Sequence, residues 1–259
     1  MAEQWSNAAQ EQFGRQAAQY VHSSTHSTGD TLQVVVDWAD PKGTERTLDV
    51  ATGVGFTAFA LAPQVASAVA YDLTPQMLQE AVMLARQRGL SNVSFVQGLA
   101  EHLPFPDGSF DIHTCRTAAH HFQSAADYLG EARRVLRPGG QVIMLDTVTT
   151  EDREVDAWQS HVELLRDPSH VRDYSPSEWL GFFQAAGLQV TRSDDSTFRT
   201  PLTFQDWVQR SGTPPQVARE LHGLFAAASP AVARAFEITP VGDDFSFSWP
   251  VLVVQAMKP

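Results

Sequence analysis

Residues 48–58 read Leu48-Asp49-Val50-Ala51-Thr52-Gly53-Val54-Gly55-Phe56-Thr57-Ala58, and this stretch places a carboxylate four residues before a Gly-x-Gly turn. The two glycines allow a tight connection from a strand to a helix and a close approach of the backbone to a ligand. Asp72 follows Gly53 by 19 residues, at the end of the next apolar run, where an acid typically hydrogen-bonds a ribose. The stretch therefore predicts a nucleotide site in a strand-helix-strand unit.

Asp49 favours one class of ligand over another. A dinucleotide would bring a doubly charged pyrophosphate to this turn, and a carboxylate within a few ångströms would repel it. S-adenosylmethionine brings an ammonium group instead, so the acid favours an adenosyl amino acid. The alternative is that Asp49 only caps the following helix or turn. The first interpretation is preferred because Asp49, the glycines and Asp72 fall in one frame.

Composition sets the broad class. The 259 residues are 43% hydrophobic and 19% charged, which suffices for one large α/β core with additions. We expect a single domain over 1–259, with an amino-terminal helical cover at 1–45 and a helical cap at 201–240. The net charge of −12 argues against a nucleic-acid partner, because phosphate binding draws most of its affinity from Lys and Arg.

Cysteine use and hydropathy predict the compartment. Cys115 is the single cysteine, so no internal disulfide can form. The first residues do not combine basic side chains with a long apolar run, and no run approaches about 18 apolar residues. We expect a cytoplasmic protein without a membrane-spanning helix, acting as a monomer or homodimer.

Strands alternate with helices along the chain, a pattern typical of a mostly parallel sheet covered on both faces. A helix predicted at 75–88 begins with proline at an early position and stops at Gly89. The basic group Arg133, Arg134 and Arg137 is interpreted as the last turns of a helix ending at 138–140, where cations offset the helix dipole. The predicted strands are 47–51, 66–72, 93–97, 110–115, 141–146, 188–192 and 247–256.

The segment 201–236 becomes helical and interrupts the two final strands. Its apolar residues at helical spacing are Trp207, Val208, Val217, Leu221, Leu224 and Phe225. An insertion at this point can form a lid over the mouth of the sheet, where ligands bind beyond the carboxyl ends of strands. It can equally be a packing extension, because periodicity reports only burial.

Further motifs accompany the glycine turn. They are GLAEHLPFPDGSFD at 98–111, CRTAAHHF at 115–122 and EARRVLRPGG at 131–140. With these motifs the sequence resembles the class I S-adenosylmethionine-dependent methyltransferases, in particular the ubiquinone and menaquinone biosynthesis group. Residues 165–172 and 212–215 make it similar to the YcgJ-like bacterial branch of that group.

This resemblance implies a Rossmann-like, seven-stranded, mostly parallel sheet with helices on both faces and a helical insertion before the last strand. It also implies methyl transfer from S-adenosylmethionine to a small-molecule acceptor, quinone-like or phenolic. Many members place an acid where Leu99 stands, so adenine recognition here must use the Ala100 backbone, Glu101 or apolar contact. The expected donor-binding residues are Tyr20, Asp49, Ala51, Thr52, Gly53, Gly55, Asp72, Leu73, Met77, Leu99, Ala100, Glu101 and Arg116.

The segment 13–20 is similar to the helix that closes over the donor in relatives of this type. An aromatic face near a sulfonium cation is attractive by about 0.5 to 2 kcal/mol. Tyr20 is the first candidate for a wall of the site, and Phe13 is the second. Plain helix packing remains the alternative, because Phe13, Ala17 and Tyr20 share a helical face.

Hydroxyl, phenol and activated carbon acceptors must lose a proton, and a histidine titrating near neutrality is suited to remove it. His120 and His121 follow the fourth predicted strand and are the catalytic candidates. The alternative is that one packs while the other hydrogen-bonds the backbone. His170, Arg166 and Arg172 can bind a polar substrate, although our first interpretation makes them surface ion-pair partners of Asp167 and Asp173.

No metal site is expected. His22 and His26 have the spacing of two ligands on one helical face, but the residues around them indicate a loop and no glutamate lies between them. Three functions stay open. The leading one is methyl transfer, and the others are a non-catalytic sensor or partner protein that binds the donor and a nicotinamide-dependent oxidoreductase.

Overall fold

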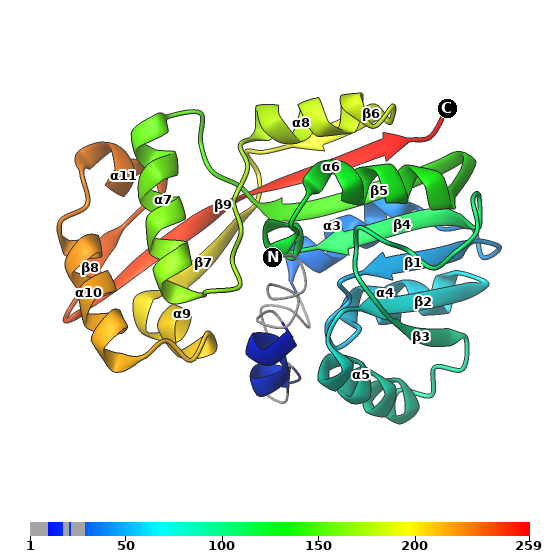
Figure 1. Cartoon of the computed structure of the whole chain (residues 1–259), viewed down its shortest axis with the longest axis horizontal. Coiled ribbons are helices and arrows are strands. Elements are labelled where there is room, and N and C mark those ends of the chain that lie inside the picture. Colours follow the sequence, from blue (N-terminus) through cyan, green and yellow to red (C-terminus); the bar gives the residue numbers. More distant parts are fainter. Residues whose placement is uncertain (1–9, 18–20, 22–28) are drawn as a thin grey trace.

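The computed structural model describes residues 10–17, 21 and 29–259. A central sheet carries helices on both faces, and a smaller helical cap lies at one end of it (Figure 1). The strands are β1 Arg46–Val50, β2 Ser67–Asp72, β3 Val93–Gln97, β4 Phe110–Arg116, β5 Leu136–Thr147, β6 Gln189–Asp194, β7 Arg199–Thr203, β8 Thr239–Val241 and β9 Asp244–Met257.

Helices connect most of these strands, and residues 10–17 are also helical. The helices are α3 Asp30–Ala39, α4 Phe56–Leu61, α5 Pro75–Gln87, α6 Ala125–Val135, α7 Arg153–Arg166, α8 Pro176–Ala185, α9 Phe204–Arg210, α10 Pro215–Ala226 and α11 Pro230–Ala235, with 3-10 turns η1 Ala62–Gln64 and η2 Ala119–His121. None of these described helices is long and apolar enough to cross a membrane.

The main sheet has the order β3-β2-β1-β4-β5-β9-β6. Strands β1 to β5 pair in parallel, whereas β9 runs antiparallel to both β5 and β6. This confirms the predicted Rossmann-like α/β fold. The sheet of the described chain contains nine strands rather than the seven expected, because β7 and β8 also pair with β9.

Alternation along the strands explains the two covered faces. In β5, Val142 and Met144 pack with α6 and α8 on one face, while Ile143 and Leu145 pack with α3 on the other. Helices α4 and α5 contact the strands at the opposite edge, with Ala70 in their shared cluster. Such continuous apolar runs are expected for a sheet buried on both faces.

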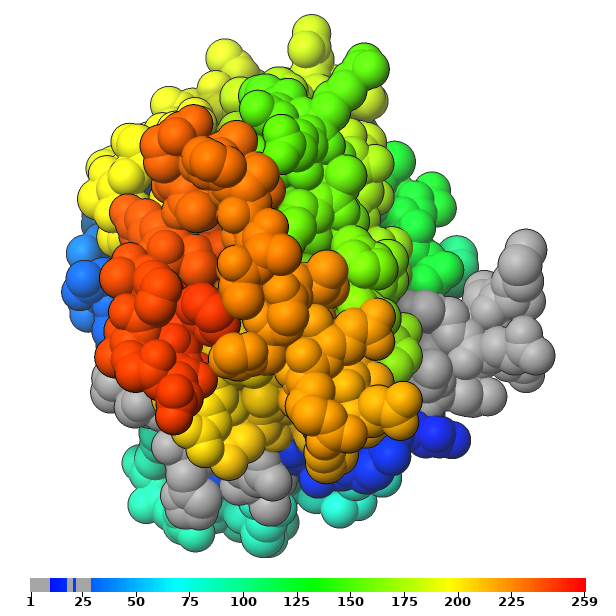
Figure 2. Space-filling view, turned by 90° about the vertical axis from the view of Figure 1, so that its left-hand side faces the viewer, coloured from blue at the N-terminus to red at the C-terminus, as the bar shows by residue number. Residues whose placement is uncertain are grey.

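Strand β9 joins the sheet to the cap. Its residues 251–257 pair with β5 and its residues 244–250 pair with β7 and β8, so one 14-residue strand runs through both parts. Helices α9, α10 and α11 pack with α7 around a core that includes Trp207, Phe225 and Trp249. Seen from the cap side, these helices close this end of the molecule (Figure 2).

The end of α6 corrects one prediction. The helix stops at Val135 and β5 starts at Leu136, so Arg137 and the Pro138-Gly139-Gly140 segment belong to the strand. Proline cannot continue the helix, and a Cβ on Gly140 would lie 2.9 Å from the Arg137 carbonyl oxygen. Arg137 therefore pairs with Asp111 across the sheet instead of ending a helix.

Candidate active site

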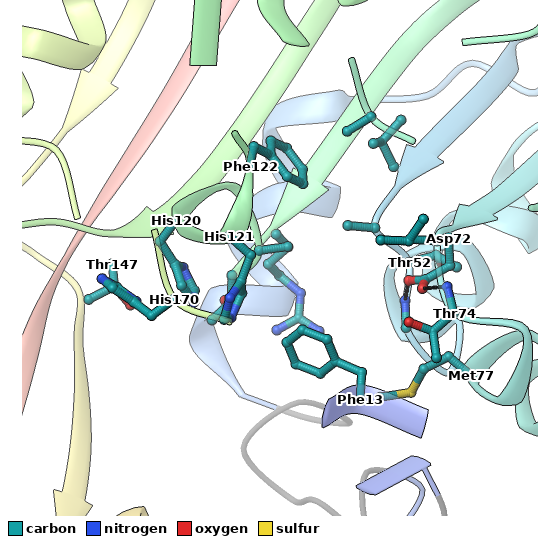
Figure 3. A pocket seen from close by; sticks show the side chains of 18 of the residues that line it. Phe13, Thr52, Asp72, Thr74, Met77, His120, His121, Phe122, Thr147 and His170 are labelled. Atoms are coloured by element: carbon teal, nitrogen blue, oxygen red, sulfur yellow. Dashed lines mark hydrogen bonds between the residues drawn. The ribbon is translucent and has the colours of Figure 1, made fainter. Parts of the chain in front are cut away.

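One cavity is lined by residues from the carboxyl ends of β1, β2, β4 and β5 and continues to the cap (Figure 3). Thr52, Asp72, Thr74 and Met77 lie on one side of it, which we call the glycine-turn half. The histidines of residues 120, 121 and 170 lie on the other side, the histidine half. Parallel strands end at one edge, which brings these distant segments together.

Asp49 lines the glycine-turn half near the end of β1 and is 2% exposed. Its Oδ1 accepts a hydrogen bond from Thr114 Oγ1 at 2.7 Å, and its Oδ2 accepts from Thr52 Oγ1 at 2.5 Å and from the Ala58 amide at 3.2 Å. Burial raises the pKa of this carboxyl, and the two threonine hydroxyls oppose the shift. The group is thus oriented by β4, by the turn and by α4.

The turn after β1 needs unusual backbone angles. Ala51, Gly53 and Gly55 have φ values of 53°, 56° and 93°, so the prediction that β1 includes Ala51 is wrong by one residue. A Cβ on Gly55 would lie 2.4 Å from the ring of the buried Phe59, which requires glycine there. Gly53 has open space around it and lines the cavity, so a ligand can approach its backbone closely.

Asp72 ties the turn to the end of β2. Its two carboxylate oxygens accept hydrogen bonds from the Gly53 amide at 2.7 Å and the Thr74 amide at 2.8 Å. Burial raises the pKa of Asp72 to about 6, although these backbone bonds oppose the shift. The acid expected to hold a ribose is therefore next to the turn expected to hold the rest of the ligand.

The segment after β3 completes this half. The Tyr71 hydroxyl donates to the Leu99 carbonyl at 2.9 Å, and a Cβ on Gly98 would lie 2.0 Å from that hydroxyl oxygen. Glu101 accepts a hydrogen bond from the Gln123 amide at 2.8 Å. The backbone at Leu99 is therefore held by Tyr71, and the Glu101 carboxylate is held by the segment after η2.

Arg116 brings a cation into the glycine-turn half. Its Nε donates to Thr57 Oγ1 at 3.0 Å. Burial lowers the pKa of the guanidinium and the Asp49 carboxylate opposes that effect. The group stays charged at neutral pH, because a guanidinium titrates far above it.

The structure brings together most of the predicted donor-binding residues. Gly55 shapes the turn from outside the cavity lining, and Tyr20 lies outside the described residues. Phe13 lines the cavity, and its ring meets the His121 ring edge-on at 4.8 Å. The predicted residues that line the cavity are Asp49, Ala51, Thr52, Gly53, Asp72, Leu73, Met77, Leu99, Ala100, Glu101 and Arg116.

His120 forms a dyad with Asp146 at the end of β5. Its Nδ1 lies 2.7 Å from Asp146 Oδ1, and its amide donates to Asp146 Oδ2 at 2.8 Å. Burial disfavours the imidazolium, but the Asp146 carboxylate outweighs it and the pKa of His120 rises to about 9. His120 is therefore a cation at neutral pH, contrary to the expectation of a histidine that titrates near neutrality.

His121 has the opposite character. Burial, and then the charge of His120, lower the pKa of His121 to about 4. Its Nδ1 lies 3.0 Å from the Ser169 carbonyl oxygen, which can only accept, so Nδ1 carries the proton and Nε2 is a free base. The centroids of the two rings lie 4.2 Å apart. A positively charged hydrogen-bond donor, His120, and a neutral base, His121, therefore share one wall of the cavity.

Three titratable residues of the segment 166–173 are buried rather than on the surface. Asp167, His170 and Asp173 are 3%, 4% and 2% exposed, and all three line the cavity. His170 Nε2 lies 3.8 Å from Asp173 Oδ2. The predicted partners are therefore present for Arg166 with Asp167 and for His170 with Asp173, but their surface location is wrong. The segment packs between η2 and the cap, and the amides of residues 171 and 172 donate to the His120 carbonyl.

Arg166 and Arg172 have different partners. Arg166 lines the cavity and pairs with Glu163 at 3.2 Å, with Asp167 farther away at 3.9 Å. Arg172 pairs with Asp156 at 3.5 Å and Glu178 at 3.1 Å, not with Asp167 or Asp173. Both partners of Arg172 lie on helices, and no local sequence pattern pointed to them.

Several cavity residues were missed from the sequence. Thr147 lines the cavity, and Asp146 comes directly before it at the end of β5, where a polar residue after an apolar run is a usable signal for a sheet-edge site. Glu163, Trp207 and Trp249 come from α7, α9 and β9, and Trp207 Nε1 donates to Glu163 Oε1 at 3.3 Å. The cap segment thus both packs on α7 and walls the cavity, so the two interpretations of 201–236 are compatible.

The described residues contain no group of three His, Cys, Asp or Glu side chains able to hold a metal ion. His22 and His26 lie outside the described residues. Cys115 is buried and unpaired with another cysteine.

Comparison with known proteins identifies the family. Residues 48–144 match the family model described as a methyltransferase domain. The chain is 36% identical to the protein named "Uncharacterized methyltransferase YcgJ" of Bacillus subtilis, over 95% of this chain and 97% of that protein. The chain belongs to the class I S-adenosylmethionine-dependent methyltransferases.

Two other relatives are also named as methyltransferases. The structure of a putative methyltransferase from Bacillus halodurans superposes with a TM-score of 0.85 at 36% identity, covering 89% of this chain and all 100% of that one. The ubiquinone/menaquinone biosynthesis C-methyltransferase UbiE of Dinoroseobacter shibae is 40% identical over 67% of this chain and 78% of its own length.

The residues in the glycine-turn half of this methyltransferase fit S-adenosylmethionine chemically. That molecule carries an ammonium, a carboxylate, a sulfonium and a ribose. The glycine-turn half offers the Asp49 and Asp72 carboxylates, the Arg116 guanidinium and an accessible backbone at Gly53. Each charge of the donor thus has an opposite or hydrogen-bonding group within this half.

Proposed function

We propose that this methyltransferase transfers a methyl group from S-adenosylmethionine to a phenolic or quinone-like small molecule in the cytoplasm. Asp49 binds the donor ammonium, Arg116 its carboxylate and Asp72 its ribose, while Leu99, Ala100 and Glu101 surround the adenine. Leu73 and Met77 supply apolar contacts, and Phe13 and Tyr20 cover the sulfonium. The names of the UbiE relatives, which act in ubiquinone and menaquinone biosynthesis, support this acceptor class.

The observation that carries the proposal is the histidine pair beside the donor half. The pKa values of His120 and His121 are displaced in opposite directions, to about 9 and about 4, although the rings are only 4.2 Å apart. Environments that separate two pKa values in this way assign an acid and a base. Both rings line the same cavity as Asp49 and Asp72.

Each histidine then has a defined task. When bound, S-adenosylmethionine supplies an electrophilic methyl group and becomes a neutral thioether. His121 Nε2 accepts the hydroxyl proton of the acceptor, and the His120 imidazolium, held by Asp146, hydrogen-bonds the acceptor oxygen as negative charge grows there. The acceptor carbon or oxygen forms the new bond to the methyl carbon. For a ring carbon, the displaced ring proton leaves to solvent.

Calorimetric titration tests the donor part. We expect S-adenosylhomocysteine and S-adenosylmethionine to bind and NAD not to bind. A phenol and quinol panel with labelled donor then tests transfer. Donor binding with every acceptor left unchanged would favour a sensor protein over the proposed enzyme, and binding of NAD alone would overturn the donor assignment.

Kinetics of variants test the histidine pair. His121→Ala should lower kcat by about 100-fold, the usual size of a general-base effect, with donor affinity unchanged.

Asp146→Asn should move the alkaline limb of the pH profile from about 9 toward lower pH, because the Asp146 carboxylate raises the pKa of His120. His161→Ala, an exposed histidine of α7, is the matched control. An alkaline limb that Asp146→Asn leaves in place would remove His120 from this role.

A further inference from the structure

Three residues that line the cavity carry buried polar atoms without partners among the described residues. Trp249 Nε1, Asp173 Oδ1 and His170 Nε2 make no hydrogen bond to any part of the chain that the structure describes. Their residues are only 4%, 2% and 4% exposed, and all of them line the cavity. Leaving such groups unpaired is unfavourable, so a group inside the cavity that satisfies them gains binding energy.

His170 and Asp173 adjoin the proposed acid-base pair, and Trp249 lines the same cavity beside the cap. The His170 ring lies 5.5 Å from the His120 ring, and its Nε2 lies 3.8 Å from Asp173 Oδ2. The Trp249 ring lies 6.1 Å from the Trp207 ring, which walls the same cavity. An acceptor held by the two histidines would therefore extend toward Asp173 and the two tryptophans.

Within the part of the chain that the structure describes, two cations near these atoms each have a carboxylate beside them, although Arg166 Nε makes no hydrogen bond. Arg166 lies 3.2 Å from Glu163, and His120 lies 2.7 Å from Asp146. The Asp167 carboxylate also lines the cavity and accepts hydrogen bonds from the Ser169 hydroxyl and amide. A ligand anion placed here would face the Glu163, Asp146 and Asp167 carboxylates, which already neutralise Arg166 and His120, so an uncharged group is favoured.

The protonation of the neighbours points to donors. Burial raises the pKa of Asp173 to about 8, so its carboxyl is mainly neutral at pH 7. Gln159 Nε2 donates to Asp173 Oδ2 at 3.0 Å, which places the carboxyl proton on the unpaired Oδ1. Burial and the charge of His120 lower the pKa of His170, so this ring is neutral as well. The cavity wall therefore offers an indole N–H and a carboxyl O–H as unpaired hydrogen-bond donors.

We propose that Trp249, Asp173 and His170 form a second acceptor subsite, which binds an uncharged oxygen group, a carbonyl or hydroxyl, at the end of the acceptor remote from the methylated atom. The proposal rests on the function proposed above. The methyl acceptor then carries two oxygen groups, one at the histidine pair and one at the cap.

The test uses three stable phenols on the full chain saturated with S-adenosylhomocysteine. They are phenol, para-hydroxyacetophenone with an added carbonyl, and para-hydroxybenzoate with an added carboxylate. Calorimetry at neutral pH should show the carbonyl compound binding about fivefold tighter than phenol, the effect of one neutral hydrogen bond, and the carboxylate gaining nothing. Trp249→Phe keeps an aromatic ring and should abolish that fivefold advantage without changing phenol binding.

Trp179→Phe is the matched control, because the Trp179 indole is also buried with an unpaired Nε1 but lies outside the cavity lining. It should keep the full advantage of the carbonyl compound. Tighter binding of the carboxylate, equal binding of phenol and the carbonyl compound, or an advantage that survives Trp249→Phe would each overturn the subsite. Failure of S-adenosylhomocysteine to bind at all would instead overturn the proposed function.

Discussion

At the scale of single residues, Asp49 and Asp72 act through their positions at adjacent strand ends. Asp49 Oδ2 accepts from the Thr52 hydroxyl and Asp72 Oδ2 accepts from the Gly53 amide, so both acids orient the same turn. Both are buried, and burial raises the pKa of each carboxyl. A cationic donor bound beside them would favour their charged forms, because opposite charge lowers a carboxyl pKa.

Asp49→Ala should weaken S-adenosylmethionine binding at least about tenfold, roughly 1.4 kcal/mol, through loss of an ammonium-carboxylate contact. Calorimetry measures the change. Asp49→Asn removes the charge. Its single amide oxygen can still accept from the Thr52 hydroxyl and the Ala58 amide, while its NH2 group would face the Thr114 hydroxyl oxygen, so it should lose a similar factor. Normal affinity in Asp49→Asn would mean that the residue only shapes the turn.

At the scale of elements, the connection from β1 to α4 combines left-handed backbone angles with a close helix contact. Gly55 must lack a side chain because Phe59 occupies the space, whereas Gly53 is needed for its φ of 56° and for access to its backbone. The turn is also tied to β2, because the Thr52 amide donates to the Tyr71 carbonyl at 3.0 Å. The turn is therefore held by contacts within the protein itself.

Gly53→Val should abolish donor binding while the protein stays folded. A β-branched residue at φ 56° strains the backbone but meets no neighbouring atom within 4 Å, so the turn shifts rather than the core. Gly89→Val is matched, since Gly89 has φ 67°, equally open space and a position outside the cavity lining. Circular dichroism checks the fold and calorimetry the binding. A folded Gly53→Val that binds normally would place the donor elsewhere.

At the scale of the whole molecule, buried titratable groups connect the sheet to the cap. Asp146 ends β5, Glu163 lies on α7, and Asp173 lies between α7 and α8. Burial, the largest cause, raises the pKa of Asp173 from 3.8 to about 8. A group whose folded-state pKa is raised stabilises the fold below its unfolded pKa, and that contribution is lost as the pH rises through the folded value.

Asp173→Asn should therefore gain stability relative to the wild type as the pH rises from about 4 to about 8, because the amide cannot ionise. Thermal unfolding across this range measures the difference in Tm. Asp167→Asn has the opposite sign. Burial raises the pKa of Asp167, but neighbouring charge, including that of Arg166, and the hydrogen bonds from the Ser169 hydroxyl and amide outweigh burial and lower it, so loss of this carboxylate should destabilise the fold throughout this range. A Tm difference for Asp173→Asn that does not change with pH would show that Asp173 is already ionised.

Local patterns sufficed for much of this protein. The Asp49 to Gly55 turn, the position of Asp72 and the β-α alternation predicted the fold and most of the cavity wall, because each depends on residues close in sequence. The bounds of the strand at 93–97 were also predicted correctly, since turn residues flank that apolar run. The end of α6 was misplaced because the strand pairing of Leu136 with Phe110 and the ion pair of Arg137 with Asp111 outweighed the local helical pattern.

The sequence by itself determined the class of the protein, since glycine angles, apolar periodicity and a carboxylate beside a turn are local properties of the chain. Only the tertiary structure decided the chemistry of the histidine half. Asp146 reaches His120 across 26 residues, and Gln159 reaches Asp173 from α7. Burial and neighbouring charge set the pKa values of His120, His121 and Asp173, and both exist only after the sheet, the 166–173 segment and the cap have packed together.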